Sequence, residues 1–173
     1  MKKSIFTVLL GASLIALISG CSQQKEEVAA SDINVGIILG FTGPIESLTP
    51  TMASSAEMAF KEATDAGILN GSTLNPVRAD STCIDAAAAT SAAERLVTAD
   101  NVAAIMGADC SGVTTAIANN VAVPNGVTII SPSATSPALT TIEDKGFFFR
   151  TAPSDARQGQ VLAQVVMDRG VKK

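Results

Sequence analysis

Five short blocks, most of them apolar and β-branched, are separated along the chain by longer segments in which apolar residues recur every three or four positions. Short apolar blocks are typical of buried strands, and the three-to-four spacing is typical of helices that cover a core. We therefore predict strands at 33–39, 77–81, 102–106, 127–130 and 147–150, the last of them at a sheet edge.

The segments between the strands carry helix signals. Asp85 is a preferred N-cap for an alanine-rich segment that continues to about residue 99. Gly67 and Pro124 follow two other periodic segments and end them. A last helix is expected over 155–169, with an apolar stripe on one side. Alternating strands and helices predict an α/β fold with a doubly wound parallel sheet.

The stretch 101–137 holds the candidate chemistry. It reads as strand, turn, helix, turn and strand, and such a βαβ unit is almost always a right-handed crossover in a parallel sheet. Both turns that follow the strands should then lie at the carboxyl ends of the strands, where open α/β sheets bind ligands. One turn presents Ser111 at a helix start, and the other presents Ser131, Ser133 and Thr135. Such turns suit a small ligand that carries a carboxylate.

Two motifs in this stretch resemble a known family. They are Gly-Ala-Asp-Cys-Ser at 107–111 and Ser-Pro-Ser-Ala-Thr-Ser-Pro at 131–137. Over about 33–159 the chain resembles the type I periplasmic solute-binding proteins, in the leucine/isoleucine/valine-binding branch of the ABC importers. That family has two lobes. The resemblance implies an N-terminal ligand-binding lobe at 33–151, then a hinge crossing and the first helix of an incomplete second lobe at 152–173, so we expect a fragment of a longer protein.

The resemblance also implies roles for three hydroxyl residues. The matching serine of the family binds the ligand carboxylate, whereas the local sequence alone favours Ser111 as a helix N-cap. The matching threonine donates to the carboxylate and receives the ligand's ammonium, whereas Thr135 could otherwise be a turn hydroxyl. At Ser133 the family uses main-chain groups.

The loop after the first strand departs from the family pattern. Family members often place an aromatic residue there as a wall for the ligand's side chain, and the matching position here is Leu48. The chain contains no tyrosine. Leu48 keeps the wall apolar, so an aliphatic ligand fits. Phe41 is an alternative wall, although a core position beneath the turn suits it better.

The N-terminus has the pattern of an export signal. Lys2 and Lys3 precede an apolar segment at 5–18, which is shorter than the ~20 residues that span a bilayer. Small residues lead to Cys21, so we predict a lipoprotein signal peptide at 1–20 and a lipidated Cys21 followed by a polar tether to residue 32. A plain signal peptidase site is the alternative. With Cys21 lipidated, Cys83 and Cys110 remain as a pair; export favours their disulfide, and the family bridges these two points.

Composition narrows the function classes. The net charge is −4, and it becomes −6 when Lys2 and Lys3 are removed with the signal peptide, which argues against nucleic acid as a partner. The chain has no histidine, so nucleophile systems that need one are excluded within it. Neither a phosphate-binding loop nor a metal-ligand cluster is present in the sequence. We therefore expect no enzyme activity, no cofactor and no metal.

The resemblance implies an extracytoplasmic, lipid-anchored solute-binding protein that serves an ABC permease. Its ligand would be a branched-chain or similar small aliphatic amino acid. Two alternatives remain open. One is a sensory domain for amino acids or amides that passes lobe closure to a signalling partner, because one fold can serve both functions. The other is a structural lipoprotein without a ligand.

Overall fold

Five parallel strands form one sheet in the computed structural model of the protein, which describes residues 30–171. The order across the sheet is β2-β1-β3-β4-β5, so the chain reverses its direction of growth between β1 and β3. Reversal points of this kind are where parallel α/β sheets open a crevice for ligands. The strands are β1 (Ile33–Leu39), β2 (Leu74–Asp80), β3 (Ala104–Gly107), β4 (Thr128–Ser131) and β5 (Phe148–Arg150).

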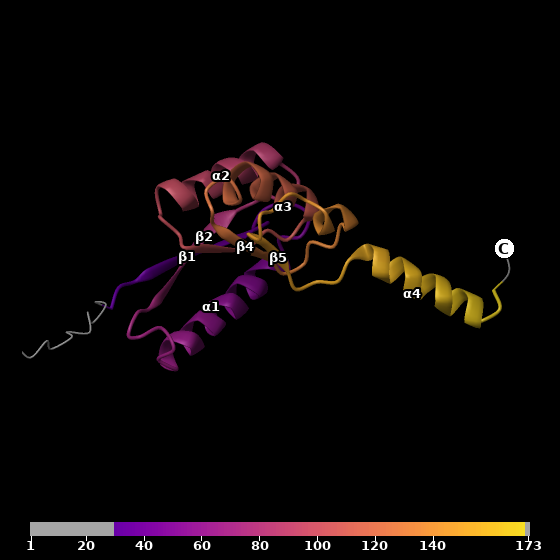
Figure 1. Ribbon diagram of the computed structural model, residues 1–173, viewed down its shortest axis with the longest axis horizontal. Helices are drawn as coiled ribbons and strands as arrows, with labels where there is room; N and C mark the ends of the chain where they lie inside the picture. Colours follow the sequence, from indigo (N-terminus) through magenta and orange to yellow (C-terminus); the bar gives the residue numbers. More distant parts are fainter. Residues whose placement is uncertain (1–29, 172–173) are drawn as a thin grey trace, which may run out of the picture.

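Helices cover both faces of the sheet, with α1 on one face and α2 and α3 on the other (Figure 1). A π-helical turn extends α3, and a 3-10 turn precedes β5. The predicted α/β class and doubly wound parallel sheet are confirmed. The bounds are α1 (Thr49–Asp65), α2 (Ala86–Thr98), α3 (Ser111–Ile117), η1 (Ala118–Ala122), η2 (Pro137–Thr140) and α4 (Asp155–Asp168).

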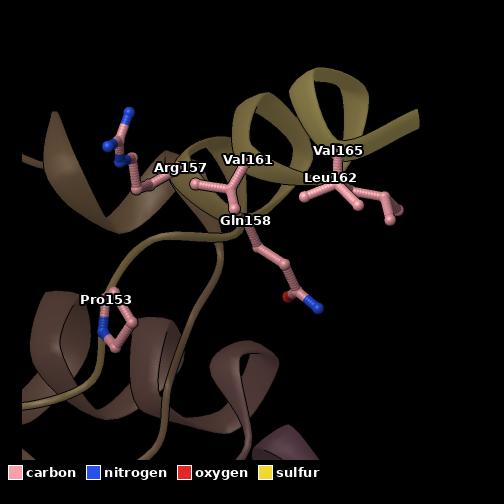
Figure 2. Close-up of a pocket in the computed structure, with 6 residues that line it drawn as sticks. All are labelled: Pro153, Arg157, Gln158, Val161, Leu162 and Val165. Carbon is pink, nitrogen blue, oxygen red and sulfur yellow. The ribbon is translucent and has the colours of Figure 1, made fainter. Parts of the chain in front are cut away.

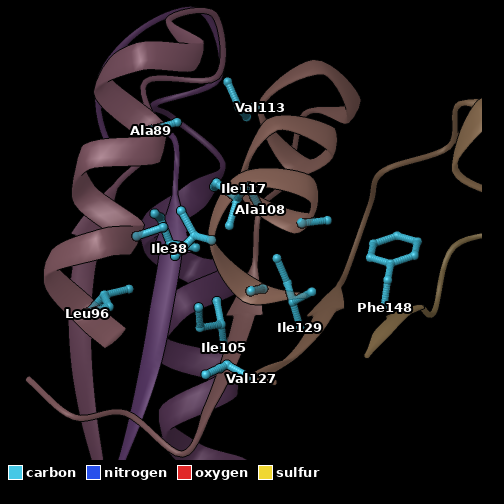
Figure 3. Close-up of a cluster of buried hydrophobic side chains, with 14 of the residues drawn as sticks. Ile38, Ala89, Leu96, Ile105, Ala108, Val113, Ile117, Val127, Ile129 and Phe148 are labelled. Carbon is cyan, nitrogen blue, oxygen red and sulfur yellow. The ribbon is translucent and has the colours of Figure 1, made fainter. Parts of the chain in front are cut away.

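The core lies in two layers because successive strand residues point to opposite faces of a sheet. Ile38 packs with the layer under α2 and α3, which also contains Leu96 and Ile105 (Figure 3). Its neighbours Ile37 and Leu39 pack on the other face, against α1. Phe41 is half-buried in this second layer. It therefore occupies the core position that we preferred for it over a ligand wall.

Some helices and strands begin where the sequence predicts, and others begin earlier because of their local sequence. Asp85 caps α2 as predicted, because its carboxylate accepts from the N–H groups of Ala87 and Ala88. Helix α1 begins at Thr49, earlier than the apolar period suggests, with Pro50 in its first turn, where proline fits well. Strand β2 begins at Leu74, three residues earlier than predicted, and contains Pro76. An edge strand tolerates proline because one side of its backbone is unpaired.

Helix α4 projects away from the rest of the molecule (Figure 1). It contains no buried residue, and its apolar side chains are exposed by 39% to 64%. The predicted stripe is therefore present and is uncovered by the rest of residues 30–171. No helix in this range is long and apolar enough to cross a membrane. The predicted signal peptide and Cys21 lie outside the described residues.

Candidate functional site

The two hydroxyl-rich turns meet at the carboxyl ends of β3 and β4. The hydroxyl of Ser133 donates to the main-chain oxygen of Asp109 over 3.0 Å. The main-chain N–H of Ser136 donates to Oγ of Ser111 over 3.1 Å. The right-handed crossover argument predicts this meeting, and the two contacts join the turns directly.

Ser111 is not the N-cap of α3, so that local interpretation is wrong. Cys110 holds the cap position in an extended conformation, and Ser111 is the first helical residue. The Ser111 hydroxyl accepts from Ser136 instead of from its own helix. A hydroxyl has one donor as well as its acceptor lone pairs. Because no hydrogen bond within residues 30–171 uses the Ser111 proton, this half-buried hydroxyl can donate to a ligand.

Thr135 links the second turn to α4. Its hydroxyl donates to a carboxylate oxygen of Asp155 over 3.0 Å, and the N–H of Asp155 donates to the carbonyl of Thr135 over 2.9 Å. Thr135 is half-buried, and its donated proton leaves the oxygen lone pairs as acceptors. Sequence reasoning did not foresee the contact with Asp155, which lies 20 positions away.

Hydrogen bonds on both sides hold the 131–137 turn in place. Buried Ser131 donates to the carbonyl of Ala108 and accepts from the N–H of Ala134. From β5, the guanidinium of Arg150 donates to the carbonyls of Ala134 and Ser136, at 3.3 and 2.8 Å. The main chain of this turn is therefore fixed before any ligand arrives, which lowers the entropy cost of binding.

Asp109 is a functional candidate that sequence reasoning missed. Its side chain is 3% exposed and accepts from the N–H of Gly40 at 2.7 Å, the N–H of Cys110 at 2.8 Å and the hydroxyl of Ser81 at 3.3 Å. These donors come from the ends of three different strands. The available signal was an acidic residue in a tight turn directly after a buried strand.

A disulfide joins Cys83 and Cys110, with their Cα atoms 5.2 Å apart, and it is the pair that the resemblance implies. The two cysteines follow β2 and β3, which are not neighbours, because β1 lies between them. The bridge therefore passes over the end of β1. A Cβ atom at Gly40 would lie 3.2 Å from Cβ of Cys83, a tight contact that a small shift of the bridge would have to relieve.

The loop after β1 is tied to the end of β2. Asp80 accepts from the Thr42 hydroxyl at 2.6 Å and from the N–H of Thr82 at 2.8 Å. Partial burial tends to raise the pKa of Asp80, but hydrogen bonds from Thr42, Thr82 and Phe41 outweigh it and hold the pKa below its usual value. Leu48 lies at the far end of the same loop, immediately before α1, and is 59% exposed.

A separate hollow of about 430 Å³ lies against α4 (Figure 2). Its lining is almost wholly apolar and comes from α4 and the segment before it, including Pro153 and Leu162. None of the predicted site residues lines it. We assign the candidate site to the hydrogen-bonded turns instead, because they present the polar groups that orient a ligand. Within residues 30–171, no cluster of acidic and cysteine side chains could hold a metal ion.

A parallel sheet with two fixed, hydroxyl-bearing turns beside its reversal point has the geometry at which α/β lobes typically bind small molecules. The chain belongs to the periplasmic binding protein family, which matches residues 32–173. Membership of this family implies a location outside the cytoplasm.

Named relatives match almost the whole of this chain in sequence. The Leu/Ile/Val-binding protein homolog 1 of Brucella abortus (strain 2308) is 35% identical over 170 residues. The leucine-specific-binding protein of Salmonella typhimurium is 29% identical over 168 residues. Each match covers 97% of this chain, and the chain spans only 42% of the length of each relative.

A solved structure is also similar to this chain in both sequence and fold. It is the branched-chain amino acid transporter substrate-binding protein of Streptococcus pneumoniae in complex with isoleucine, which is 31% identical to this chain. The superposition has a TM-score of 0.64 and covers 72% of this chain and 34% of that one. The matched part of this chain therefore has the fold of part of a substrate-binding protein that was solved with isoleucine.

Proposed function

We propose that the protein is an extracytoplasmic solute-binding protein of an ABC importer, with a branched-chain or similar small aliphatic amino acid as its ligand. The relatives named for leucine, isoleucine and valine support this ligand class. The observation that carries the proposal is the contact between Ser111 and Ser136, because it fixes the Ser111 hydroxyl and leaves its proton for an acceptor.

The ligand carboxylate would accept from Ser111 and from the backbone N–H groups in the first turn of α3, which have no partners within their own helix. The ammonium would donate to the hydroxyl oxygen of Thr135, whose own proton goes to Asp155. Ser133 would contribute through its main chain. Leu48, exposed in the neighbouring loop, would face the aliphatic side chain.

The remaining parts follow the family's two-lobe architecture. Residues 33–151 would form the N-terminal lobe, and 152–173 would form the hinge crossing and the first helix of a second lobe. The exposed apolar stripe on α4 supports this division, because such a face is expected to pack against another layer. Closure of the lobes would shift an existing open–closed equilibrium that an ABC permease recognises. Residues 21–32 would tether the protein to the membrane through lipid on Cys21.

Substitution at the two hydroxyl positions tests the site. Ser111→Ala and Thr135→Ala should each weaken the binding of leucine, isoleucine or valine by about 1.5–3 kcal/mol, the usual contribution of a hydrogen bond to a charged group. This corresponds to roughly tenfold or more in Kd. Isothermal titration calorimetry on the exported protein, extended to include the second lobe, gives the Kd values.

Ser133→Ala is the matched control, because it removes a neighbouring hydroxyl whose proton already goes to Asp109. Its effect on the Kd should be smaller than that of the other two variants. Unchanged affinity in both Ser111→Ala and Thr135→Ala would show that the carboxylate and the ammonium are held elsewhere, and the proposed site would be abandoned.

A further inference from the structure

The ligand contacts proposed above leave the side chain of Asp109 unused, although this residue lies in the turn directly before Ser111. Three donors face its two carboxylate oxygens: two main-chain N–H groups and the Ser81 hydroxyl. An ionised carboxylate is an acceptor only, so it matches these surroundings. None of the ion pairs formed within residues 30–171 includes Asp109. Its negative charge is therefore solvated by dipoles and is not cancelled by a cation.

This charge is close to the proposed ligand position. The main-chain oxygen of Asp109 receives the Ser133 hydroxyl from the second turn. The carboxylate accepts from the N–H of Cys110 at 2.8 Å, and Cys110 directly precedes Ser111. Because the side chain is 3% exposed, little water lies around the carboxylate to screen it. Two nearby charges interact more strongly beside a protein interior than in bulk water.

The sign of the charge distinguishes two kinds of ligand with the same shape. A carboxylate compound without an ammonium group brings a net negative charge towards Asp109 and is repelled. A zwitterionic amino acid brings no net charge, because its ammonium offsets its carboxylate. A repulsive element that acts on only one of two competitors creates specificity without improving the contacts of the other.

We propose that Asp109 is a specificity-determining residue that selects zwitterionic aliphatic amino acids over anionic carboxylates of the same shape. This selection rests on the proposed function, because it assumes a carboxylate bound between the two turns. Asp109 acts on the ligand through space, and its hydrogen bonds to Gly40 and Cys110 hold the charge in position.

The test compares leucine with 4-methylpentanoate, which is leucine without its ammonium group. Calorimetry on the exported, oxidised protein gives both Kd values for the wild type and for Asp109→Asn. In the variant the ratio of the 4-methylpentanoate Kd to the leucine Kd should fall by about tenfold, equivalent to about 1.4 kcal/mol. Asp109→Ser, whose hydroxyl can accept one of the same N–H groups, should give a fall of similar size if the amide disturbs folding.

Ser81→Ala is the matched control, because it removes one hydrogen bond to the same carboxylate and keeps the charge. Its ratio should stay at the wild-type value, whereas a merely structural role for Asp109 would weaken both ligands equally in every variant. An unchanged ratio in Asp109→Asn, or an equal fall in Ser81→Ala, overturns the selection and leaves the proposed function standing. A wild type with both lobes that binds neither compound overturns both proposals.

Discussion

At the scale of single residues, carboxylates organise the loops of this lobe. Asp80 joins the loop after β1 to the end of β2 through hydrogen bonds from Thr42 and Thr82. Those bonds favour the charged form and lower its pKa despite partial burial. Gly43 makes the joint possible, because a Cβ atom there would lie 2.5 Å from the carbonyl oxygen of Thr82.

Because the pKa of Asp80 is lowered in the folded protein, its charge should contribute to the free energy of unfolding at neutral pH and lose that contribution in acid. A carboxyl group with a lowered folded-state pKa contributes stability above its unfolded value, near 3.9, and that contribution is lost as the pH falls through the folded value. Asp80→Asn should therefore destabilise the protein by about 1 kcal/mol at pH 7. It should also reduce the loss of stability below pH 4, measured by urea unfolding at several pH values.

Glu57 provides the comparison for that experiment. Its hydrogen bond from Arg78 lowers its pKa in the same direction, and Glu57 lies on α1. Glu57→Gln should likewise reduce the loss of stability in acid, while the hydrogen bonds from Thr42 and Thr82 to Asp80 stay in place. If Asp80→Asn and the wild type lose the same free energy of unfolding below pH 4, ionised Asp80 does not stabilise the protein as predicted.

Sequence patterns located the hydroxyl residues but not all of their partners. Ser111 and Ser133 could be placed together because both follow strands of one βαβ unit. The role of Asp109 depends on donors from β1 and β2 that are distant in sequence, so no local pattern contains it. The helix start was misplaced by one residue because a serine was given the cap position that Cys110 occupies.

At the scale of secondary structure elements, the Cys83–Cys110 disulfide fastens two loops that the sheet alone keeps apart. It encloses a separation of 27 residues that includes the whole of α2. Because Cys110 is also the cap residue of α3, the bridge anchors the helix that presents Ser111.

Loss of the disulfide should lower the free energy of unfolding by roughly 3–4 kcal/mol in the chain-entropy account of cross-links. The double variant Cys83→Ser/Cys110→Ser, compared with the oxidised wild type in urea unfolding, measures this difference. The two single variants should lose a similar amount. Thiol counting on unreduced, exported protein should find neither cysteine reactive, and two reactive thiols would refute the prediction.

Elements with a strong local signal could be predicted, whereas their order in the sheet could not. The observed bounds of β1 agree with the prediction because its apolar run favours a buried strand. The start of α2 agrees because Asp85 caps it. The position of β1 between β2 and β3 follows from long-range pairing that no single segment encodes. Pro76 obscured the first half of β2, since only an edge position makes a proline acceptable there.

At the scale of the whole molecule, one well-packed lobe is followed by a helix that it does not bury. The sheet and helices α1 to α3 share two continuous apolar layers, and α4 adds nothing to either. The lobe is therefore expected to fold as a unit without help from α4.

The proposed attachment to the membrane is also a property of the whole chain. Cys21→Ser should abolish lipid modification and leave the protein either unprocessed or released from the membrane. Metabolic labelling with a palmitate analogue, followed by separation of membrane and soluble fractions, measures both effects. Cys83→Ser is the control, because it changes a cysteine in the lobe and should keep the label. An unlabelled wild type would indicate ordinary secretion or an uncleaved anchor.

The two hydrogen bonds between Thr135 and Asp155 have a mechanical consequence. They connect the turn of the proposed site to the first residue of α4. Under the proposed function, the ligand would bind directly at the pivot about which everything after residue 155 rotates. A small shift at the contact between Thr135 and Asp155 would then produce a large displacement of the residues after 155. Thr135 would then transmit the arrival of the ligand as well as hold it.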